Sequence, residues 1–267
     1  MRQYVVDAFT GEVFKGNPAA ICVLDKWLPE DLMASITLEN RLSETAFTVR
    51  EGDAWHLRWF TTAGEINLCG HATLATAYVL MSFYGEKGPV RFSTLGGALE
   101  VRQGGGGMLK MDFPAYALRE VPVADKIEKA MGARPARAFM GRDLLCVFDS
   151  ASTIRALDPR DGDLLGLDGL LVHATAHGDD GTPYDCVSRS FGPKCGVHED
   201  PVCGSGHCHI APYWSGELKK PEILAWQASR RGGELRCRVE GGRVIIAGKA
   251  ALYAKSEILP GLSKELK

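Results

Sequence analysis

Two cysteine–glycine pairs, Cys69-Gly70 and Cys203-Gly204, are the first candidates for chemistry in this sequence. Each pair follows an aromatic strand-like run, a glycine-containing turn and an acidic residue, and each leads into a helix-like run, so that residues 58–73 are echoed by residues 189–207. The two cysteines lie about half the chain apart. This spacing predicts a duplicated domain with one site between the copies.

The helix starts behind these pairs suggest what the site would bind. A helix start exposes unpaired N–H groups and carries a partial positive charge. If the starts at Gly70-His71 and Gly204-Ser205 meet in a cleft, they would bind a small carboxylate. Gly70, Gly204 and Gly206 lack a Cβ, which suits both close approach of a ligand and a tight turn. Ser205 is common at helix starts in any protein, so a cap and a ligand contact both stay open.

The elements that must position these residues are mostly strands in the first half. Short β-rich runs are expected at 4–9, 19–24, 45–49 and 56–60, and a helix at Leu28-Pro29-Glu30. The run from His71 to Phe83 is apolar nearly all round, which predicts a helix buried on every side. Strands are also expected at 90–93, 98–102 and 109–113. The glycines at 104–107 lack the features of a phosphate loop and predict a hairpin turn.

After Pro114 the pattern restarts, with a helix at 125–131, strands at 136–140, 144–149, 170–175 and 184–191, and a helix from Gly204 to about Leu218. Each half predicts a curved sheet around one apolar helix, which is an α+β fold. We expect an N-terminal barrel domain of residues 1–115, completed by a C-terminal segment at about 255–267. Residues 116–254 would form the second barrel, with the active site in the cleft between the two.

The amino-acid composition limits the classes of partner that this chain can bind. The chain has 267 residues, of which 45% are hydrophobic and 24% charged, and a formal net charge of −2. This balance disfavours nucleic acid and anionic lipid as partners, and no apolar run approaches the roughly 20 residues of a membrane span. We expect a cytoplasmic protein with a small-molecule substrate, and an exposed sheet edge would favour a homodimer. Four cysteines lie in apolar stretches and are expected to be buried thiols: Cys22, Cys146, Cys186 and Cys237.

Five motifs carry a resemblance to a known family. They are Val-Asp-Ala-Phe-Thr at 6–10, Phe-Lys-Gly-Asn-Pro at 14–18, Ser-Glu-Thr-Ala-Phe at 43–47, Leu-Cys-Gly-His-Ala-Thr-Leu-Ala at 68–75 and Glu-Asp-Pro-Val-Cys-Gly-Ser-Gly-His at 199–207. In this order the sequence resembles the phenazine-biosynthesis-like (PhzF-like) isomerases over nearly its whole length. The resemblance implies the diaminopimelate epimerase-like fold, in which two similar domains related by a pseudo-twofold each wrap a barrel-like sheet around a central helix.

The resemblance also implies roles for three residues. Glu44 would be the acid/base that moves a proton on a carboxylate-bearing substrate, and His71 and Asp200 would line the same pocket. A carboxylic side chain can take and return a proton when desolvation raises its pKa from about 4.3 toward neutrality. Asp200 could hold His71 in one tautomer or bind a substrate amine. With no nucleotide, flavin or pyridoxal motif in the sequence, no cofactor is expected.

Two other functions remain open from the sequence. In related epimerases and proline racemases, two cysteines at the helix starts exchange protons across the substrate's α-carbon, and this chain has both, Cys69 and Cys203. The commoner PhzF-like pattern has threonine in place of Cys203, and helix starts are expected to lower thiol pKa values. We favour Glu44 because Glu44 and His71 mark the glutamate-type isomerases. A non-catalytic binding protein on the same fold is the third hypothesis.

A zinc site within residues 195–209 is the least favoured hypothesis. Six potential ligands lie within 195–209: Cys195, His198, Cys203, His207, Cys208 and His209. They include no Cys-x-x-Cys pair, and neighbouring helix residues such as His207 and Cys208 project about 100° apart. We therefore predict no metal.

Overall fold

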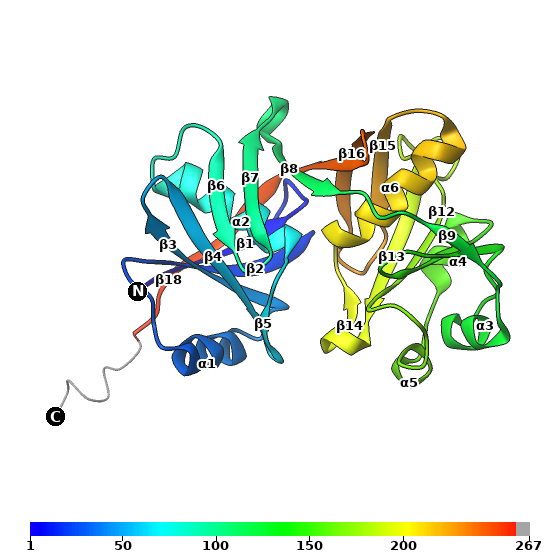
Figure 1. Ribbon diagram of the computed structural model, residues 1–267, viewed down its shortest axis with the longest axis horizontal. Helices are drawn as coiled ribbons and strands as arrows, with labels where there is room; N and C mark the ends of the chain where they lie inside the picture. The colour runs from blue at the N-terminus through cyan, green and yellow to red at the C-terminus, as the bar shows by residue number, and fades with distance from the viewer. Residues whose placement is uncertain (260–267) are drawn as a thin grey trace.

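The computed structural model describes residues 1–259, which form two lobes side by side (Figure 1). In the first lobe, strands surround the long helix α2 (Gly70–Phe83), and α1 (Glu30–Asn40) lies at one end. Its strands are β1 (Arg2–Ala8), β2 (Asn17–Leu24), β3 (Glu44–Glu51), β4 (Ala54–Thr61), β5 (Gly64–Ile66), β6 (Val90–Thr94) and β7 (Gly97–Gln103). The predicted α+β class and the predicted helix after Cys69 are confirmed.

The second lobe is built around α6 (Gly204–Leu218). Its strands are β9 (Arg119–Val121), β10 (Arg137–Met140), β11 (Leu144–Val147), β12 (Val172–His177), β13 (Cys186–Gly192), β14 (Val197–Asp200), β15 (Glu222–Gln227), β16 (Gly233–Glu240) and β17 (Arg243–Gly248). The shorter helices are α3 (Asp125–Met131), α4 (Ala151–Ala156) and α5 (Asp161–Leu164). Sequence patterns missed β5, β9, β14, α4 and α5, because runs of three to six residues are too short for a period to show. Within residues 1–259, no helix is both long and apolar enough to cross a bilayer.

One continuous sheet joins the lobes. Strand β8 (Leu109–Pro114) pairs with β7 on one side and with β17 on the other, so that Met111 is opposite both Val101 and Ile246. Strand β18 (Ala250–Glu257) then returns to the first lobe and pairs with β1. The returning strand begins at Ala250, a few residues before the predicted segment, and residues 260–267 of that segment lie outside the described residues. The domain boundaries themselves stay predictions.

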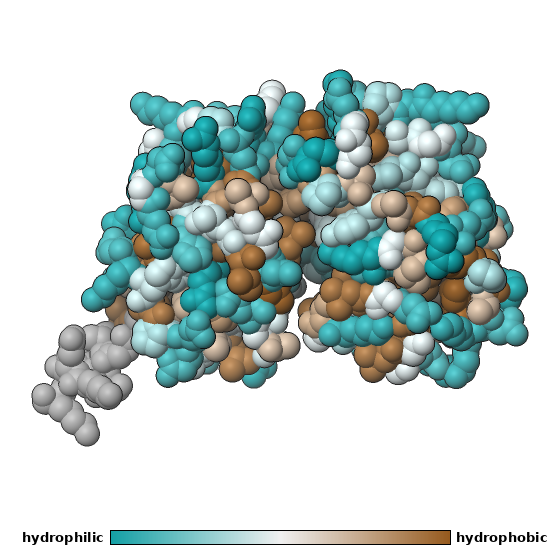
Figure 2. Space-filling view, viewed as in Figure 1, coloured by the Kyte–Doolittle hydropathy of each residue, from teal (hydrophilic) through white to brown (hydrophobic). Residues whose placement is uncertain are grey.

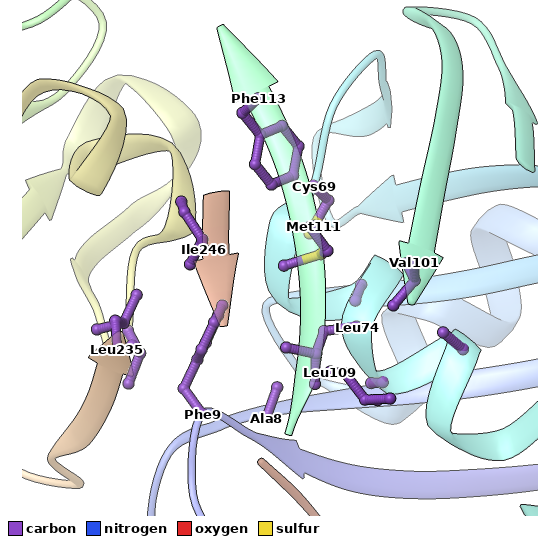
Figure 3. Packing of buried hydrophobic residues seen from close by; sticks show 14 of the residues in the cluster. Ala8, Phe9, Cys69, Leu74, Val101, Leu109, Met111, Phe113, Leu235 and Ile246 are labelled. Atoms are coloured by element: carbon purple, nitrogen blue, oxygen red, sulfur yellow. The ribbon is translucent and has the colours of Figure 1, made fainter. Parts of the chain in front are cut away.

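A shared hydrophobic core holds the two lobes together. One cluster of buried residues runs from Leu74 on α2, across Met111 and Phe113 on β8, to Leu235 and Ile246 in the second lobe (Figure 3). The helix α2 is buried almost all round, as its apolar pattern predicts. Because close-packed interiors deform little, this core sets where the two helix starts lie relative to each other.

A proline within α6 ties this helix to the chain segment that crosses between the lobes. Pro212 has no N–H, so the carbonyl of Cys208 lacks the usual intrahelical partner. The N–H of Tyr116, just after the crossover, donates to that carbonyl at 3.0 Å. The crossover is thereby anchored on the helix whose N-terminus faces the other lobe.

Candidate active site between the lobes

The starts of α2 and α6 meet at the junction of the lobes. A Cβ built on either Gly70 or Gly204 would lie 3.6 Å from the Cα of the other, so the two backbones are in close contact. A cavity of about 340 Å³ lies beside this contact, and residues of both lobes line it. Its walls include residues of β5 and β14, which face each other across the notch between the lobes (Figures 1 and 2). The structure thus brings together the two halves of the predicted site.

Glu44 and His71 form a close pair on the first-lobe wall of the cavity. Glu44 begins β3, His71 follows Gly70 in α2, and Glu44 Oε2 lies 3.1 Å from His71 Nε2. Both side chains are nearly buried, at 15% and 5% exposed, yet the pair is not oriented as a hydrogen bond, and neither atom has another partner within residues 1–259. A buried polar atom without a partner is costly, so these two atoms are available to a bound molecule.

The charge state of His71 follows from its neighbours. Burial, the largest single influence, favours the neutral ring, but the combined attraction of Cys69 and Glu44 outweighs it and raises the pKa of His71 well above its usual value. On its other side, His71 Nδ1 lies 3.5 Å from Cys69 Sγ. Glu44 is the neighbour that attracts the imidazolium, because Cys69 would have to be a thiolate to do so, and burial raises the pKa of that thiol. The raised pKa of His71 therefore favours the imidazolium form of this ring beside Glu44.

Asp200 ends β14 and lines the cavity from the second lobe. Burial raises its pKa, and the charge of His71 partly opposes this. Its Oδ1 accepts hydrogen bonds from Asn17 Nδ2 at 2.8 Å and from the N–H of Val202 at 3.2 Å. Asn17 is a fully buried residue of the first lobe, so this contact crosses the junction. Asn17 belongs to the quoted Phe-Lys-Gly-Asn-Pro motif, and that motif was the only signal in the sequence that could have singled it out.

The two cysteines occupy the helix starts but differ from expectation in their acidity. Burial, followed by the charge of Glu44, raises the pKa of Cys69; burial, followed by the charge of Asp200, raises that of Cys203 well above its usual value. The expectation that helix starts lower these pKa values is therefore wrong, because desolvation and nearby carboxylates outweigh the helix end. Cys203 Sγ accepts the N–H of Gly206 at 3.3 Å and so caps α6.

The remaining predicted ligand contacts divide between the cavity and the core. Gly70, Gly204 and Ser205 line the cavity. Gly206 does not; a Cβ there would lie 2.8 Å from His173 Cε1, so packing inside the second lobe explains this glycine. Sequence reasoning assigned no role to Arg142 or Lys194, which also line the cavity. Lys194 lies within the echoed segment 189–207, whereas Arg142 lies outside every motif that the sequence analysis singled out.

Possible metal ligands gather in two places within residues 1–259: Glu44, Cys69 and His71, and Asp143, His173 and His209. Of the six clustered cysteines and histidines between 195 and 209, only His209 belongs to either group. In the second group the atoms are already engaged, because His173 Nε2 lies 3.3 Å from Asp143 Oδ2 and His209 Nε2 accepts the N–H of Asp143 at 3.2 Å.

Comparisons with known proteins identify the family of this chain. The family model described as phenazine biosynthesis-like protein matches residues 6–256. A protein of Pseudomonas aeruginosa named an uncharacterized isomerase is 47% identical over 95% of this chain and 96% of its own length. A phenazine biosynthesis-like domain-containing protein of Mus musculus is 37% identical over 96% of this chain and 98% of its own.

Solved structures extend the likeness to the fold. A crystal structure of a phenazine biosynthesis protein of the PhzF family from Enterococcus faecalis superposes with a TM-score of 0.93 at 46% identity, covering 97% of this chain and 98% of that one. A probable proline racemase from Agrobacterium radiobacter gives a TM-score of 0.69 at 12% identity, over 99% of this chain and 94% of that one. At this identity the second likeness concerns the fold alone.

Proposed function

This chain belongs to the phenazine biosynthesis-like protein family, and from that membership we propose that it is an isomerase that moves a proton on a small carboxylate-bearing substrate. Glu44 serves as the acid/base, assisted by His71 and Asp200. The observation that carries the proposal is the Glu44–His71 pair, whose facing atoms are 3.1 Å apart, buried and without a hydrogen-bond partner within the described residues, on the wall of the cavity where two helices begin.

In this proposal the helix starts bind the substrate, and Glu44 and Asp200 transfer the proton. The N–H groups at the starts of α2 and α6 hold the substrate carboxylate, since helix starts bind anions. Glu44 takes a proton from a carbon of the substrate, and the C–H electrons move into the adjacent conjugated system. Return of that proton at another carbon by Glu44 restores the starting enzyme. If Asp200 in its protonated form delivers its own proton instead, a proton must pass from Glu44 to Asp200 before the next turnover. The raised pKa of Asp200 suits it to deliver a proton. No cofactor is needed for this exchange.

The state of the thiols supports Glu44 over the two-cysteine alternative. A thiol pair needs one thiolate as the base, whereas burial and neighbouring carboxylates raise the pKa of both Cys69 and Cys203. Cys203 Sγ also caps α6 through Gly206. The sulfur of Cys203 thus has a structural role that does not require proton transfer.

The test is deuterium incorporation from D₂O into a panel of small amino and cyclic carboxylic acids. Glu44→Gln keeps the shape of the side chain and removes its basicity, so exchange is expected to fall by about 10² to 10⁴. Cys203→Thr restores the commoner residue of the family, and we expect exchange to fall by less than about tenfold, because the thiol is assigned no proton.

Glu65→Gln is the matched control for Glu44→Gln. Glu65 also lines the cavity, but Arg58 Nε donates to it at 2.7 Å, so its carboxylate is already satisfied. Exchange should survive this change. If Cys203→Ser abolishes exchange while Glu44→Gln preserves it, the protein belongs with the thiol racemases in mechanism, and exchange with none of the acids would favour a binding protein.

A further inference from the structure

Two cations lie on the second-lobe wall of the cavity, apart from the Glu44–His71 pair on the first-lobe wall. Arg142 lies between β10 and β11, and Lys194 lies in the 3-10 turn η2 (Pro193–Cys195); both line the cavity with Ser205. Neither cation has a part in the proton transfer described above. Their position calls for a separate account.

Arg142 is held from behind by a buried hydrogen-bonded chain. Its Nε donates to Asp143 Oδ2 at 3.0 Å, and Asp143 is fully buried. His173 Nε2 lies 3.3 Å from the same oxygen, and His173 Nδ1 lies 2.9 Å from Ser190 Oγ. The guanidinium also stacks over Tyr116, with its carbon 5.0 Å from the ring centroid. This support fixes the plane of the guanidinium at the cavity wall.

The hydrogen atoms on this wall can be counted. A guanidinium has five N–H donors. Arg142 uses four of them within the described residues: one from Nε and one from Nη2 to Asp143, one from Nη2 to Ser205 Oγ at 3.1 Å, and one from Nη1 to Tyr116 Oη at 3.2 Å. One Nη1 hydrogen is left. Because Arg142 donates to Ser205 Oγ, the Ser205 hydroxyl keeps its own proton, which can go to Cys203 Sγ at 3.5 Å or to a bound ligand.

Lys194 supplies a third donor. Its Nζ donates to the carbonyls of Leu167 and Gly169, the latter at 2.7 Å, which leaves one of its three hydrogens. These partners are neutral, and in the part of the chain that the structure describes no carboxylate pairs with Lys194. The Arg142 charge is balanced by Asp143, whereas the Lys194 charge is not balanced by any of these contacts.

We propose that Arg142, Lys194 and Ser205 form an anion subsite that holds a second carboxylate of the substrate, so that the substrate is a dicarboxylate. This inference rests on the proposed function, in which the first carboxylate lies at the helix starts. The placement follows from charge, because Lys194 brings to this wall a positive charge that none of its contacts balances, and that charge attracts an anion.

Binding of simple aromatic acids tests the subsite without the natural substrate. Benzoate has one carboxylate, and phthalate, isophthalate and terephthalate have two at three spacings. At equal ionic strength, titration calorimetry should show wild-type protein binding at least one dicarboxylate about tenfold tighter than benzoate, the order expected for one added charge-assisted hydrogen bond. In Lys194→Gln and Arg142→Lys this preference should fall to less than about threefold.

Lys194→Gln and Lys126→Gln separate the loss of the subsite charge from a loss of folding or of net charge. Arg142 neutralises buried Asp143, so Arg142→Lys can destabilise the lobe; Lys194 is exposed, and Lys194→Gln should fold normally. Lys126→Gln makes the same charge change in the same lobe away from the cavity and should keep the preference. If no dicarboxylate binds wild type tighter than benzoate, or if the preference survives in Lys194→Gln, the subsite is overturned.

The subsite and the proposed function can fail separately. Glu44→Gln should retain the dicarboxylate preference while losing deuterium exchange. If wild type binds dicarboxylates preferentially but exchanges no deuterium, the isomerase proposal fails and the subsite stands. If exchange depends on Glu44 but the preference is absent, the reverse holds.

Discussion

At the scale of single residues, Asn17 is the clearest example of a group that acts through another. Its Nδ2 donates to Asp200 Oδ1 at 2.8 Å and to the Val202 carbonyl at 3.0 Å. Because Oδ1 already accepts two N–H donors, a proton on Asp200 is directed to Oδ2. Asn17 is therefore a positioning residue, and it decides which oxygen of Asp200 carries a proton.

Asn17→Ala should move the pH dependence of deuterium exchange. Loss of one donor to Asp200 destabilises its carboxylate, so the raised pKa of Asp200 rises further and the corresponding limb of the pH–rate profile shifts to higher pH. Asn40→Ala is the control, since Asn40 Nδ2 bonds Gln3 and Thr45 and lies outside the cavity lining. A fall in rate with an unmoved profile, or the same shift in Asn40→Ala, would contradict the assignment.

Buried histidines on α6 should make stability depend on pH. Burial lowers the pKa of His207 to about 4, although a hydrogen bond to the Cys203 carbonyl opposes it, and burial lowers that of His209 to about 3. Unfolded histidine titrates near 6.5, so between these values the unfolded chain binds more protons. The stabilisation is present above about pH 6.5 and is lost as pH falls toward 4, by roughly 3 kcal/mol for His207.

Urea unfolding between pH 7 and pH 4.5 measures this dependence. In His207→Gln the loss of stability on acidification should shrink but persist, because His209 still contributes. An identical slope in wild type and His207→Gln would show that His207 is not the group responsible.

At the scale of elements, packing requires a glycine at one position of α6 and not at another. A Cβ at Gly206 would lie 2.8 Å from His173 Cε1 and 3.2 Å from Ser190 Oγ, whereas a Cβ at exposed Gly216 meets nothing within 4 Å. Gly206→Ala should destabilise the protein by about 1–3 kcal/mol through overpacking. Gly216→Ala should stabilise it by about 0.5–1 kcal/mol, because alanine loses less backbone entropy in a helix.

Chemical denaturation of the two variants should show a loss of stability for Gly206→Ala and a gain for Gly216→Ala. Gly206→Ala should also reduce deuterium exchange, because it displaces the start of α6 on which Gly204 and Ser205 lie. Equal effects of the two substitutions on stability would mean that the contact with His173 is not what requires Gly206.

At the scale of the whole molecule, the shared core predicts that the lobes unfold together. Residues of both lobes belong to one buried cluster, and β8 pairs into both halves of the sheet. Calorimetry should show a single transition, and Phe113→Ala should lower its midpoint without splitting it, at a cost of about 3–5 kcal/mol. Two separate transitions in wild-type protein would show that each lobe has an independent core.

The sequence by itself determined the features that short stretches of chain encode. The all-round apolar run from His71 to Phe83 specified a buried helix, and the Cys-Gly pairs placed two helix starts in matching contexts. These patterns are local, because the spacing of apolar residues within a short segment indicates whether that segment forms a helix or a strand. The five motifs were enough to identify the family.

Only the tertiary structure decided which distant residues share the site and what their environment does to them. Asn17 meets Asp200 across the junction, and Arg142 and Lys194 reach the same cavity from a loop and from a 3-10 turn, with no spacing in the sequence that pairs them. The acidity of Cys203 was predicted in the wrong direction, because burial and the charge of Asp200 outweigh the helix start. Desolvation and Coulomb interactions depend on neighbours in space, and those neighbours are fixed only when both lobes pack around one core.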